Sequence, residues 1–433
     1  MRLIGIDIGT TSICLVCFEK DSIRPLLILR RQNVFLPGTF EQDPEEIINK
    51  VIGLLAEVPA AGIEMETIDA IGISGQMHGI LYVDQEGRAV SPFFTWKDEK
   101  GKQYFRDGYS YERYLESRTG YMMCSGFGMV THFYLKMNGM IPETALKAAG
   151  IGDYLAMRLT GRKSPLTDIT MGASLGGFDL RKRNFDFAMF EQAGVDTSFL
   201  PQLSRPGEIA GYYLGIPVSP AYGDNQASFY GALDKPEVQI SINVGTGAQV
   251  SLFDRDFMQT DMADIRPFFH KGFLYVGASL NGGKVYEKLA AFFEETVFAF
   301  TGLKINAFEQ MSRLGGEIKE TDLMIRPSLY GFRGMDESAR GQVENLTADN
   351  FHPAGIIRGY VKGMADELYQ IYEKFPDEMK KNRKEIIASG NGIRKNLLLA
   401  EEVEKRFGMP VILKDMEEEA AVGAALAASA CLL

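Results

Sequence analysis

Two short turns of glycine and threonine, far apart in the chain, carry residue types that bind phosphate. The first is Gly9-Thr10-Thr11-Ser12 in "DIGTTS", and the second is Gly245-Thr246-Gly247 in "NVGTGAQ". Such turns offer backbone N–H groups and hydroxyls without bulky side chains, which suits phosphate oxygens. One copy alone is equally typical of an ordinary hairpin turn. Two copies favour a phosphate site, and because no Gly-Lys-Ser/Thr follows, neither turn is a Walker A loop.

Asp7 ends the first apolar run of the chain, directly before the first turn. A carboxylate without a partner is costly in an apolar strand, so Asp7 is expected to have one. Beside a phosphate, that partner is magnesium, bound directly or through water. The alternative is a carboxylate that caps its own turn, which we favour less.

Asp224 stands between a glycine and two amide side chains in "GDNQAS", where a helix of small residues is expected to start. It is either a helix N-cap or the group that takes a proton from a substrate, and the two roles are compatible. The positive end of the helix dipole is expected to lower the pKa of Asp224. This predicts a carboxylate that is ionised at neutral pH and acts through its placement more than its basicity.

The elements that hold these residues alternate between strand and helix. "RLIGID" and "ICLVCFEK" are predicted strands on either side of the first turn, and "DAIGI" and "ILYVD" are two more. A helix is predicted after Asp43, with Pro44 in its first position and Glu46 completing a capping box. This order is that of an α/β domain.

The same order returns in the second half of the chain. "QISINVGTGAQVSLF" is again strand, turn and strand, and "EIIASGNG" is a strand that runs into a glycine turn before a helix over about 396–407. "MPVILK" is a further strand, and "EEEAAVGAALAASACLL" is a closing helix. We therefore predict two α/β lobes that arose by duplication, residues 1–235 and 236–433, packed across a cleft.

Composition narrows the class of protein. The chain has 433 residues, enough for two domains, and a net charge of −11, which makes a nucleic acid an unfavourable partner. The sequence shows neither a signal peptide nor an apolar run of the roughly 20 residues that cross a bilayer. We expect a cytoplasmic protein without membrane contact.

The cysteines are not expected to bind metal. Cys14 and Cys17 form a C-x-x-C, but residues three apart on a strand point to opposite faces. We interpret these two, with Cys124 and Cys431, as small apolar fillers in a reducing compartment.

Stretches along nearly the whole chain resemble the FGGY family of carbohydrate kinases. These stretches are "IGIDIGTTS", "ISGQMHG", "TWKD", "GDYLAMRLTG", "GDNQAS", "NVGTGAQVS", "GASLNGGKV", "SGNGIRKN" and "EEAAVGAALAA". The resemblance implies two actin-like (ribonuclease H-like) lobes with ATP and a sugar bound in a central cleft. Within the family, the chain is most similar to the kinases of sedoheptulose, and the kinases of xylulose come next.

The resemblance also implies roles for the matching residues. Gly9, Thr10, Thr11 and Ser12 would hold the terminal phosphates of ATP, Asp7 the magnesium shell, and Thr246, between Gly245 and Gly247, the transferring phosphoryl group. The adenosine would be bordered by Gly390, Asn391, Gly392 and Asn396. The sugar would be lined by Gln76, Met77, His78, Trp96 and Asp98, with Asp224 as the base facing its terminal hydroxyl.

The chemistry of the sugar-site residues agrees with these roles. A ketose offers a row of hydroxyls, which Gln76, His78 and Asp98 suit, and Trp96 supplies a flat apolar wall. Each of these residues taken alone is more often structural. The implied partners are ATP, Mg2+ and a ketose, for a monomer or homodimer.

The chain departs from the family pattern at two places that bear on the sugar. Glu99 and Lys100 stand where relatives often have Gly-Arg, and Phe332 stands where similar sequences tend to have a glutamate. A second class of function uses the same scaffold, namely a nucleotide-dependent binding or assembly module like actin. The sugar-site stretches favour the kinase.

Overall fold

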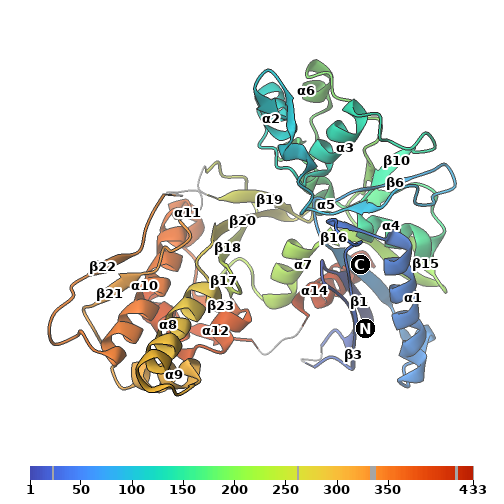
Figure 1. Ribbon diagram of the computed structural model, residues 1–433. Coiled ribbons are helices and arrows are strands. Elements are labelled where there is room, and N and C mark those ends of the chain that lie inside the picture. The colour runs from blue at the N-terminus through green and yellow to red at the C-terminus, as the bar shows by residue number, and fades with distance from the viewer. Residues whose placement is uncertain (22–23, 261–262, 332–337, 415–417, 433) are drawn as a thin grey trace. The chain divides into compact units, whose positions relative to one another are not determined.

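The computed structural model describes residues 1–21, 24–260, 263–331, 338–414 and 418–432. By its contacts the chain forms two compact units (Figure 1). Unit 1 comprises residues 1–231, 266–271 and 416–433, and unit 2 comprises residues 232–265 and 272–415. The expected division after residue 235 assigns 266–271 and the closing helix to the second lobe, whereas by contacts both belong with unit 1. The domain boundary along the chain stays a prediction.

A mixed sheet forms the centre of unit 1. In spatial order its strands are β14 (Gln202–Leu203), β11 (Leu166–Thr167), β16 (Ile216–Gly223), β5 (Ala70–Gly75), β1 (Arg2–Ile8), β2 (Ser12–Glu19) and β3 (Leu27–Gln32), with β15 (Gly211–Tyr213) on β16. β16, β5 and β1 run parallel, and their register places Ser74 beside both Asp7 and Tyr222. The carboxyl ends of these strands therefore meet at one edge of the sheet.

The first helix of unit 1 begins at the side-chain cap that the sequence predicts. In α1 (Pro44–Ala60), Asp43 accepts hydrogen bonds from the N–H groups of Glu45 and Glu46, which confirms the predicted start. Glu46 pairs with Lys50 one turn later, at 2.5 Å, in place of the expected second half of the capping box. The other helices are α2 (Tyr111–Thr119), α3 (Gly128–Met137), α4 (Ile151–Thr160), α5 (Ile169–Ser174), α6 (Phe187–Gln192), α7 (Asp224–Ala232) and α14 (Glu419–Ala430).

Short strand pairs and 3-10 turns complete unit 1. The strands are β4 (Glu41–Gln42), β6 (Leu81–Val83), β7 (Phe93–Phe94), β8 (Tyr104–Arg106), β9 (Tyr109–Ser110), β10 (Lys147–Ala149), β12 (Phe178–Asp179) and β13 (Asn184–Phe185). The 3-10 turns are Met65–Thr67 and Lys100–Lys102.

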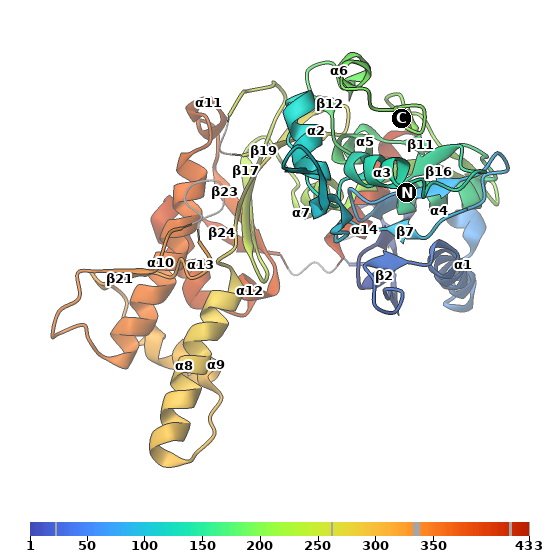
Figure 2. The same cartoon turned by 45° about the horizontal axis from the view of Figure 1, so that its top comes forward.

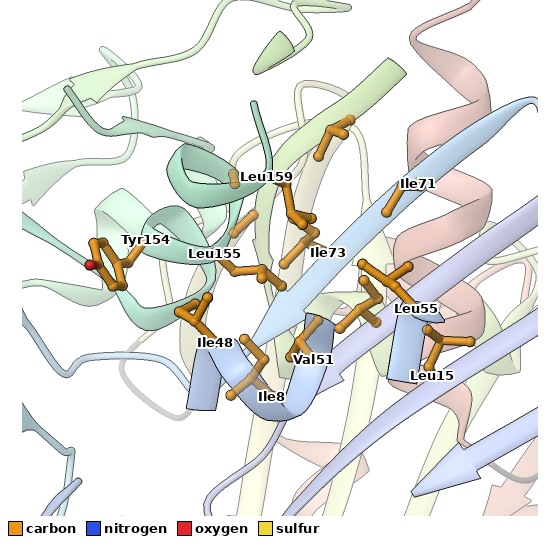
Figure 3. Packing of buried hydrophobic residues seen from close by; sticks show 14 of the residues in the cluster. Ile8, Leu15, Ile48, Val51, Leu55, Ile71, Ile73, Tyr154, Leu155 and Leu159 are labelled. Carbon is orange, nitrogen blue, oxygen red and sulfur yellow. The ribbon is translucent and has the colours of Figure 1, made fainter. Parts of the chain in front are cut away.

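Hydrophobic cores cover both faces of the unit 1 sheet. On one face, residues of α1 and α4 pack on Ile71 and Ile73 of β5, as Figure 3 shows for Val51 and Leu155. On the other face, residues of α14 pack on β1 and β2. Cys17 lies in the first core and Cys14 in the second, so the prediction that their side chains point to opposite faces is confirmed. Cys124 is exposed, and the interpretation of it as an apolar filler is wrong.

Helix α14 lies against the sheet with no room for side chains at two glycines. A Cβ added at Gly5 would lie 1.9 Å from the carbonyl oxygen of Ala421, and one at Gly72 would lie 2.1 Å from that of Ala424. The small residues of the closing helix thus permit the contact that gathers the ends of β1 and β5 over one helix.

Unit 2 has its own mixed sheet. In spatial order its strands are β19 (Asp264–Phe268), β20 (Gly272–Ser279), β18 (Ala248–Asp254), β17 (Gln239–Val244), β23 (Glu385–Ser389) and β24 (Val411–Leu413). β21 (Met324–Arg326) and β22 (Gln342–Glu344) form a separate pair. The predicted strand, turn and strand around Thr246 is therefore confirmed as the β17–β18 hairpin.

Helices cover the unit 2 sheet and extend beyond it. They are α8 (Gly283–Thr301), α9 (Ala307–Gly316), α10 (Pro353–Glu373), α11 (Asp377–Lys380), α12 (Asn391–Arg394) and α13 (Leu397–Phe407). Figure 2 shows α8 beside α9. None of the helices in the described ranges combines the length and the apolar composition that crossing a membrane requires.

Replacement of Gly72 by alanine should destabilise the protein, because the new methyl group would push α14 off the sheet. We expect a loss of about 1–3 kcal/mol in the free energy of unfolding, the usual cost of overpacking a core. Urea unfolding followed by circular dichroism measures it. Gly53→Ala is the matched control: no atom lies within 4 Å of its added Cβ, and it should gain about 0.5–1 kcal/mol as a helix interior glycine. Equal stability of the two variants would contradict the close-packing argument.

Candidate active site

Asp7 lies at the carboxyl end of β1, where Ser74 of β5 donates a hydrogen bond to its Oδ1. Burial, and after it the negative charge of Asp224, raise the pKa of Asp7 to about 7, although the hydrogen bond from Ser74 acts in the opposite direction. Among the described residues, the hydrogen-bond partner of this carboxylate is the Ser74 hydroxyl, which leaves Oδ2 for the predicted magnesium or another ligand.

Asp224 is the first residue of α7, immediately after β16. Its Oδ1 accepts a hydrogen bond from the N–H of Asn225 at 2.7 Å. Burial raises the pKa of Asp224 to about 6, although this hydrogen bond and the charge of Arg266 act in the opposite direction. The expected lowering of this pKa is wrong, because loss of hydration outweighs the helix end. At pH 7 most of the group is still ionised.

The two carboxylates repel each other, and this repulsion suits a cation site. Carboxylate oxygens are the ligands that Mg2+ prefers, and it commonly takes one or two of them together with phosphate oxygens and water. Across the described part of the chain, no cluster of three or more His, Cys, Asp or Glu side chains is suited to a metal ion. Asp7 therefore fits a magnesium ion that is held mainly by a nucleotide.

Two amide side chains hold the first predicted phosphate turn through its carbonyl oxygens. Asn33 Nδ2 donates to the carbonyl oxygen of Gly9 at 2.9 Å, and Gln42 Nε2 donates to that of Thr10 at 2.9 Å. The side chains of Thr11 and Ser12 are exposed. The sequence reasoning did not identify Asn33 or Gln42, since neither belongs to a motif with phosphate chemistry.

A chain of hydrogen bonds joins this turn to two of the predicted sugar residues. Trp96 Nε1 donates to Thr10 Oγ1 at 3.0 Å, and Thr10 Oγ1 donates to Gln76 Oε1 at 3.4 Å. Gln76 is 1% exposed, and its Nε2 donates to Gln42 Oε1 at 2.8 Å. Its amide is thus engaged within the protein, whereas the Trp96 ring is 46% exposed and is available as a wall. The structure brings Gln76 and Trp96 together around Thr10.

His78 is held in a conformation that is unusual for a residue other than glycine. Its φ angle is 73°, in the left-handed region, which marks stored backbone strain of the kind found at functional sites. Its ring Nδ1 lies 2.7 Å from the carbonyl oxygen of Ser174, and the ring stacks on Phe127 with centroids 4.5 Å apart. Met77 beside it is buried, with its Sδ 4.0 Å from a guanidinium nitrogen of Arg266.

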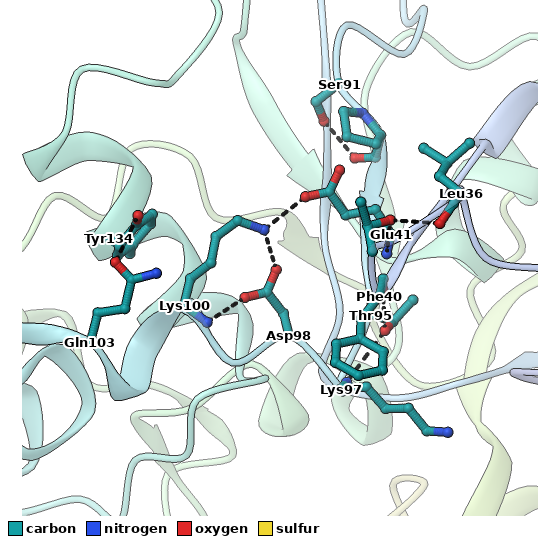
Figure 4. A network of polar contacts seen from close by, with 12 residues as sticks. Leu36, Phe40, Glu41, Ser91, Thr95, Lys97, Asp98, Lys100, Gln103 and Tyr134 are labelled. Carbon is teal, nitrogen blue, oxygen red and sulfur yellow. Dashed lines mark hydrogen bonds and ion pairs between the residues drawn. The ribbon is translucent and has the colours of Figure 1, made fainter.

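Asp98 is buried and its carboxylate is occupied by Lys100 (Figure 4). The backbone N–H of Lys100 donates to Oδ1 at 2.8 Å, and Lys100 Nζ donates to Oδ2 at 2.7 Å and to Glu41 at 2.7 Å. Lys100 stands where relatives often have an arginine, so the departure keeps a cationic partner for the buried acid. A direct sugar contact of Asp98 stays a prediction. Phe332, the other departure, lies outside the described residues.

In unit 2 the second phosphate turn rests on the start of α8. The N–H of Gly283 donates to the carbonyl oxygen of Gly245 at 2.7 Å, and that of Lys284 donates to the oxygen of Thr246 at 3.3 Å. A Cβ on Gly282 would lie 2.0 Å from the oxygen of Gly247. These contacts leave the side chain of Thr246 exposed at the tip of the hairpin. The sequence analysis includes Gly282 and Gly283 in the stretch "GASLNGGKV", but it does not predict that they support the second turn.

The predicted adenosine residues lie beside the same strand. Gly390 has φ of 86°, and a Cβ there would lie 2.5 Å from the carbonyl oxygen of Val244, as would one on Gly392 at 2.8 Å. Asn391 begins α12. Asn396 is 3% exposed and caps α13 through Leu399, while its Nδ2 has no hydrogen-bond partner among the described residues. The segment presents backbone and one buried amide nitrogen that a nucleotide can use.

A cavity of about 300 Å³ occurs elsewhere in unit 1, and none of the predicted site residues lines it. Its walls include Asp168, Tyr222, His270 and Cys431.

In a comparison with known proteins, two segments of the chain match the two domains of one protein family. Residues 2–231 match the N-terminal domain and residues 287–432 the C-terminal domain of the FGGY family of carbohydrate kinases. The chain is 28% identical to the sedoheptulokinase of Mus musculus over 98% of its own length and 96% of the relative's.

Solved structures share the fold. The xylulose kinase of Rhodospirillum rubrum matches with a TM-score of 0.81 at 18% identity, over 100% of this chain and 90% of that one. The glycerol kinase of Plasmodium falciparum, solved with ADP, matches with a TM-score of 0.78 at 18% identity, over 100% of this chain and 89% of that one. The predicted α/β fold of two actin-like (ribonuclease H-like) lobes is confirmed.

Replacement of Asp224 by asparagine should stabilise the ligand-free protein at alkaline pH. Folding raises the pKa of this carboxyl group from near 4 in the unfolded chain to about 6. The group therefore contributes stability at pH values below 4, and this contribution is lost as the pH rises through about 6. The asparagine variant does not lose it. We expect its thermal midpoint at pH 8 to exceed that of the wild type by about 2 °C or more, with the difference vanishing below pH 4. Thermal unfolding at several pH values measures this.

Glu64→Gln is the matched control, since Glu64 is an exposed carboxylate of the same unit. This variant should follow the wild type at every pH. The difference in thermal midpoint between Asp224→Asn and the wild type could instead be smaller at pH 8 than at pH 5. That result would show that the surroundings favour the ionised carboxylate, and it would contradict the prediction.

Proposed function

We propose that this chain, which belongs to the FGGY family of carbohydrate kinases, transfers the terminal phosphoryl group of ATP to the terminal hydroxyl of a ketose. The family resemblance inferred from the sequence motifs is confirmed, and with it the class of enzyme, a phosphotransferase that acts on an alcohol group. The sugar, the base and the residue roles are the content of the proposal.

The observation that carries the proposal is the gathering of unlike chemistry at one edge of the unit 1 sheet. Two carboxylates lie at the ends of strands there, Asp7 next in the chain to the turn at Gly9 to Ser12, and hydrogen bonds through Thr10 join this turn to Gln76 and to the exposed Trp96. A site for a nucleotide alone has no need of an exposed tryptophan hydrogen-bonded to the turn, nor of a second carboxylate at the same sheet edge. This argues against the alternative of a binding or assembly module.

Asp224 acts on the attacking hydroxyl in the proposed reaction. The hydroxyl oxygen forms a bond to the γ-phosphorus as the bond from that phosphorus to the β–γ bridging oxygen breaks, and ADP leaves. The hydroxyl proton passes to Asp224. Because the transition state is loose, the proton leaves late, so an ionised and well-aimed carboxylate of modest basicity suffices.

The other residues align the phosphates and offset their charge. The turn at Gly9 to Ser12 would hold the terminal phosphates, and Thr246 the transferring group. Gly390, Asn391, Gly392 and Asn396 would border the adenosine, as supported by the buried Nδ2 of Asn396. Mg2+, held through Asp7, would supply further charge neutralisation when bound.

Sedoheptulose is the favoured sugar, with sedoheptulose 7-phosphate as product, because the sedoheptulokinase of Mus musculus aligns along nearly its whole length. Xylulose and other family sugars are the alternative. The pocket residues Gln76, Met77, His78, Trp96 and Asp98 are proposed to line this sugar. A cytoplasmic location and a monomer or homodimer remain predictions.

Asp224→Asn should fold and lose at least ~10²-fold in kcat, the lower range for loss of a general base. The physical reason is that the amide keeps the hydrogen-bonding shape but cannot take the proton. A coupled assay of ADP release, with circular dichroism as the check on folding, measures the loss. Asp69→Asn in the same unit is the control and should leave kcat within about 2-fold. Near-normal turnover of folded Asp224→Asn would remove Asp224 from the role of base.

An ADP-release screen across ketoses tests the substrate. We expect the highest kcat/KM with sedoheptulose and a product phosphorylated at its terminal carbon, as located by phosphorus NMR. Activity only on an aldose, or only on glycerol, would contradict the ketose assignment. A protein that binds ATP but turns over no polyol would favour the binding module.

A further inference from the structure

A buried glutamate of α10 holds the loop on which the second phosphate turn rests. We propose that Glu367 is a positioning residue for nucleotide binding, acting through the loop "SLNGG" (Ser279 to Gly283). The inference rests on the proposed function and deepens it, since it names what fixes the nucleotide-binding half of the site in unit 2.

The contacts of Glu367 converge on two residues of this loop. Ser279 Oγ and Asn281 Nδ2 both donate to Glu367 Oε1, the latter at 2.9 Å. The N–H of Asn281 also donates to Ser279 Oγ at 2.8 Å, which closes the arrangement. Glu367 is 4% exposed and Asn281 is 5% exposed. One carboxylate oxygen thus fixes both ends of the bend that leaves β20.

Two glycines pass this restraint to the phosphate turn. Gly282 and Gly283 directly follow Asn281, and Gly283 donates to Gly245 at 2.7 Å. Gly282 lies against the backbone of Gly247 with no room for a Cβ. Displacement of Asn281 therefore moves the surface that supports the turn around Thr246.

Asn281 also fixes a second segment next to the loop. Its Nδ2 donates to the carbonyl oxygen of Gly331 at 2.8 Å, and its Oδ1 accepts from the N–H of Tyr330 at 3.2 Å. The amide of Asn281 is thereby fully engaged, and its orientation is set only when Glu367 accepts one of its hydrogens.

The electrostatics set Glu367 apart from its neighbour Asp366. Asp366 is paired with two cations, Arg326 at 2.7 Å and Arg406 at 2.9 Å. The hydrogen bonds given for Glu367 come from neutral groups, and burial raises its pKa. A buried acid held by neutral donors contributes little net stability. The effect of Glu367 is therefore to order the loop through the geometry of its hydrogen bonds.

The test compares three variants of the full chain. Glu367→Ala removes both acceptor bonds, while Glu367→Gln keeps an acceptor oxygen at the place of Oε1. Asp366→Asn is the matched control, because it weakens two ion pairs of the same helix without touching the loop. The probes are ADP and the non-hydrolysable analogue β,γ-imido-ATP with Mg2+, titrated by calorimetry, and hydrogen exchange of peptides that cover residues 277–286.

We expect Glu367→Ala to raise the Kd for both nucleotides by about 10-fold or more, the size of one lost buried hydrogen-bonding partner. It should also speed hydrogen exchange in the loop. Glu367→Gln should stay within about 3-fold of the wild type, and Asp366→Asn should lower the thermal midpoint with an unchanged Kd. The KM for the sugar should change less than 2-fold in Glu367→Ala, by the separation of the two functions.

Two outcomes overturn the inference, and they are distinguishable from failure of the proposed function. An unchanged Kd in Glu367→Ala, or an equal rise in Kd in Asp366→Asn, shows that Glu367 serves stability alone. A wild type that binds neither nucleotide refutes the kinase assignment, and the inference falls with it. Turnover of an unexpected sugar leaves these binding measurements and their interpretation untouched.

Discussion

The repulsion between Asp7 and Asp224 is the constraint on which the rest of unit 1 depends. Two carboxylates are held at the carboxyl ends of parallel strands, in surroundings that raise the pKa of each. Such a pair persists only where the surrounding backbone is packed too closely for the two carboxylates to move apart. Here β1, β5 and β16 are fixed in register, and α14 packs on them through glycines too tightly for adjustment. A bound cation would therefore relieve this repulsion, which favours its binding together with the substrate.

The supports of the two phosphate turns show how rigidity is obtained without bulk near a ligand. In unit 1 the turn is held through its carbonyl oxygens by the amide side chains of Asn33 and Gln42. In unit 2 the same purpose is met by backbone N–H groups of Gly283 and Lys284. The turns share a sequence pattern, whereas their supports differ. This is the difference expected if the turns themselves contact a phosphate and the supports do not.

Local signals explain how much of the fold the sequence predicts. The cap at Asp43, the strand and turn order around Gly9 and Thr246, and the opposite faces of Cys14 and Cys17 each follow from neighbours in the chain, and each is confirmed. The grouping of residues 266–271 with unit 1 depends on contacts between distant segments, which no local pattern encodes.

The candidate site shows the same limit more sharply. The sequence motifs offer candidate residues for the site, but they do not show what the side chains of these residues contact. The engagement of the Gln76 amide by Gln42, and that of Asp98 by Lys100, require three-dimensional neighbours. The pKa of Asp224 was predicted in the wrong direction because the helix dipole is visible in the sequence and burial is not.

Buried acids in this protein show why a raised pKa alone does not identify a functional group. Asp153 has a pKa of about 7, like Asp7, yet it accepts hydrogen bonds from Thr167 at 2.8 Å and Gly150 at 3.2 Å and caps its own helix. Asp98 is neutralised by a lysine. Asp7 and Asp224 differ in their partners: Asp7 accepts a hydrogen bond from the Ser74 hydroxyl and Asp224 one from the N–H of Asn225, and the charge of Asp224 contributes to the raised pKa of Asp7. The repulsion between Asp7 and Asp224 supports the proposed cation and substrate site at this edge of the sheet.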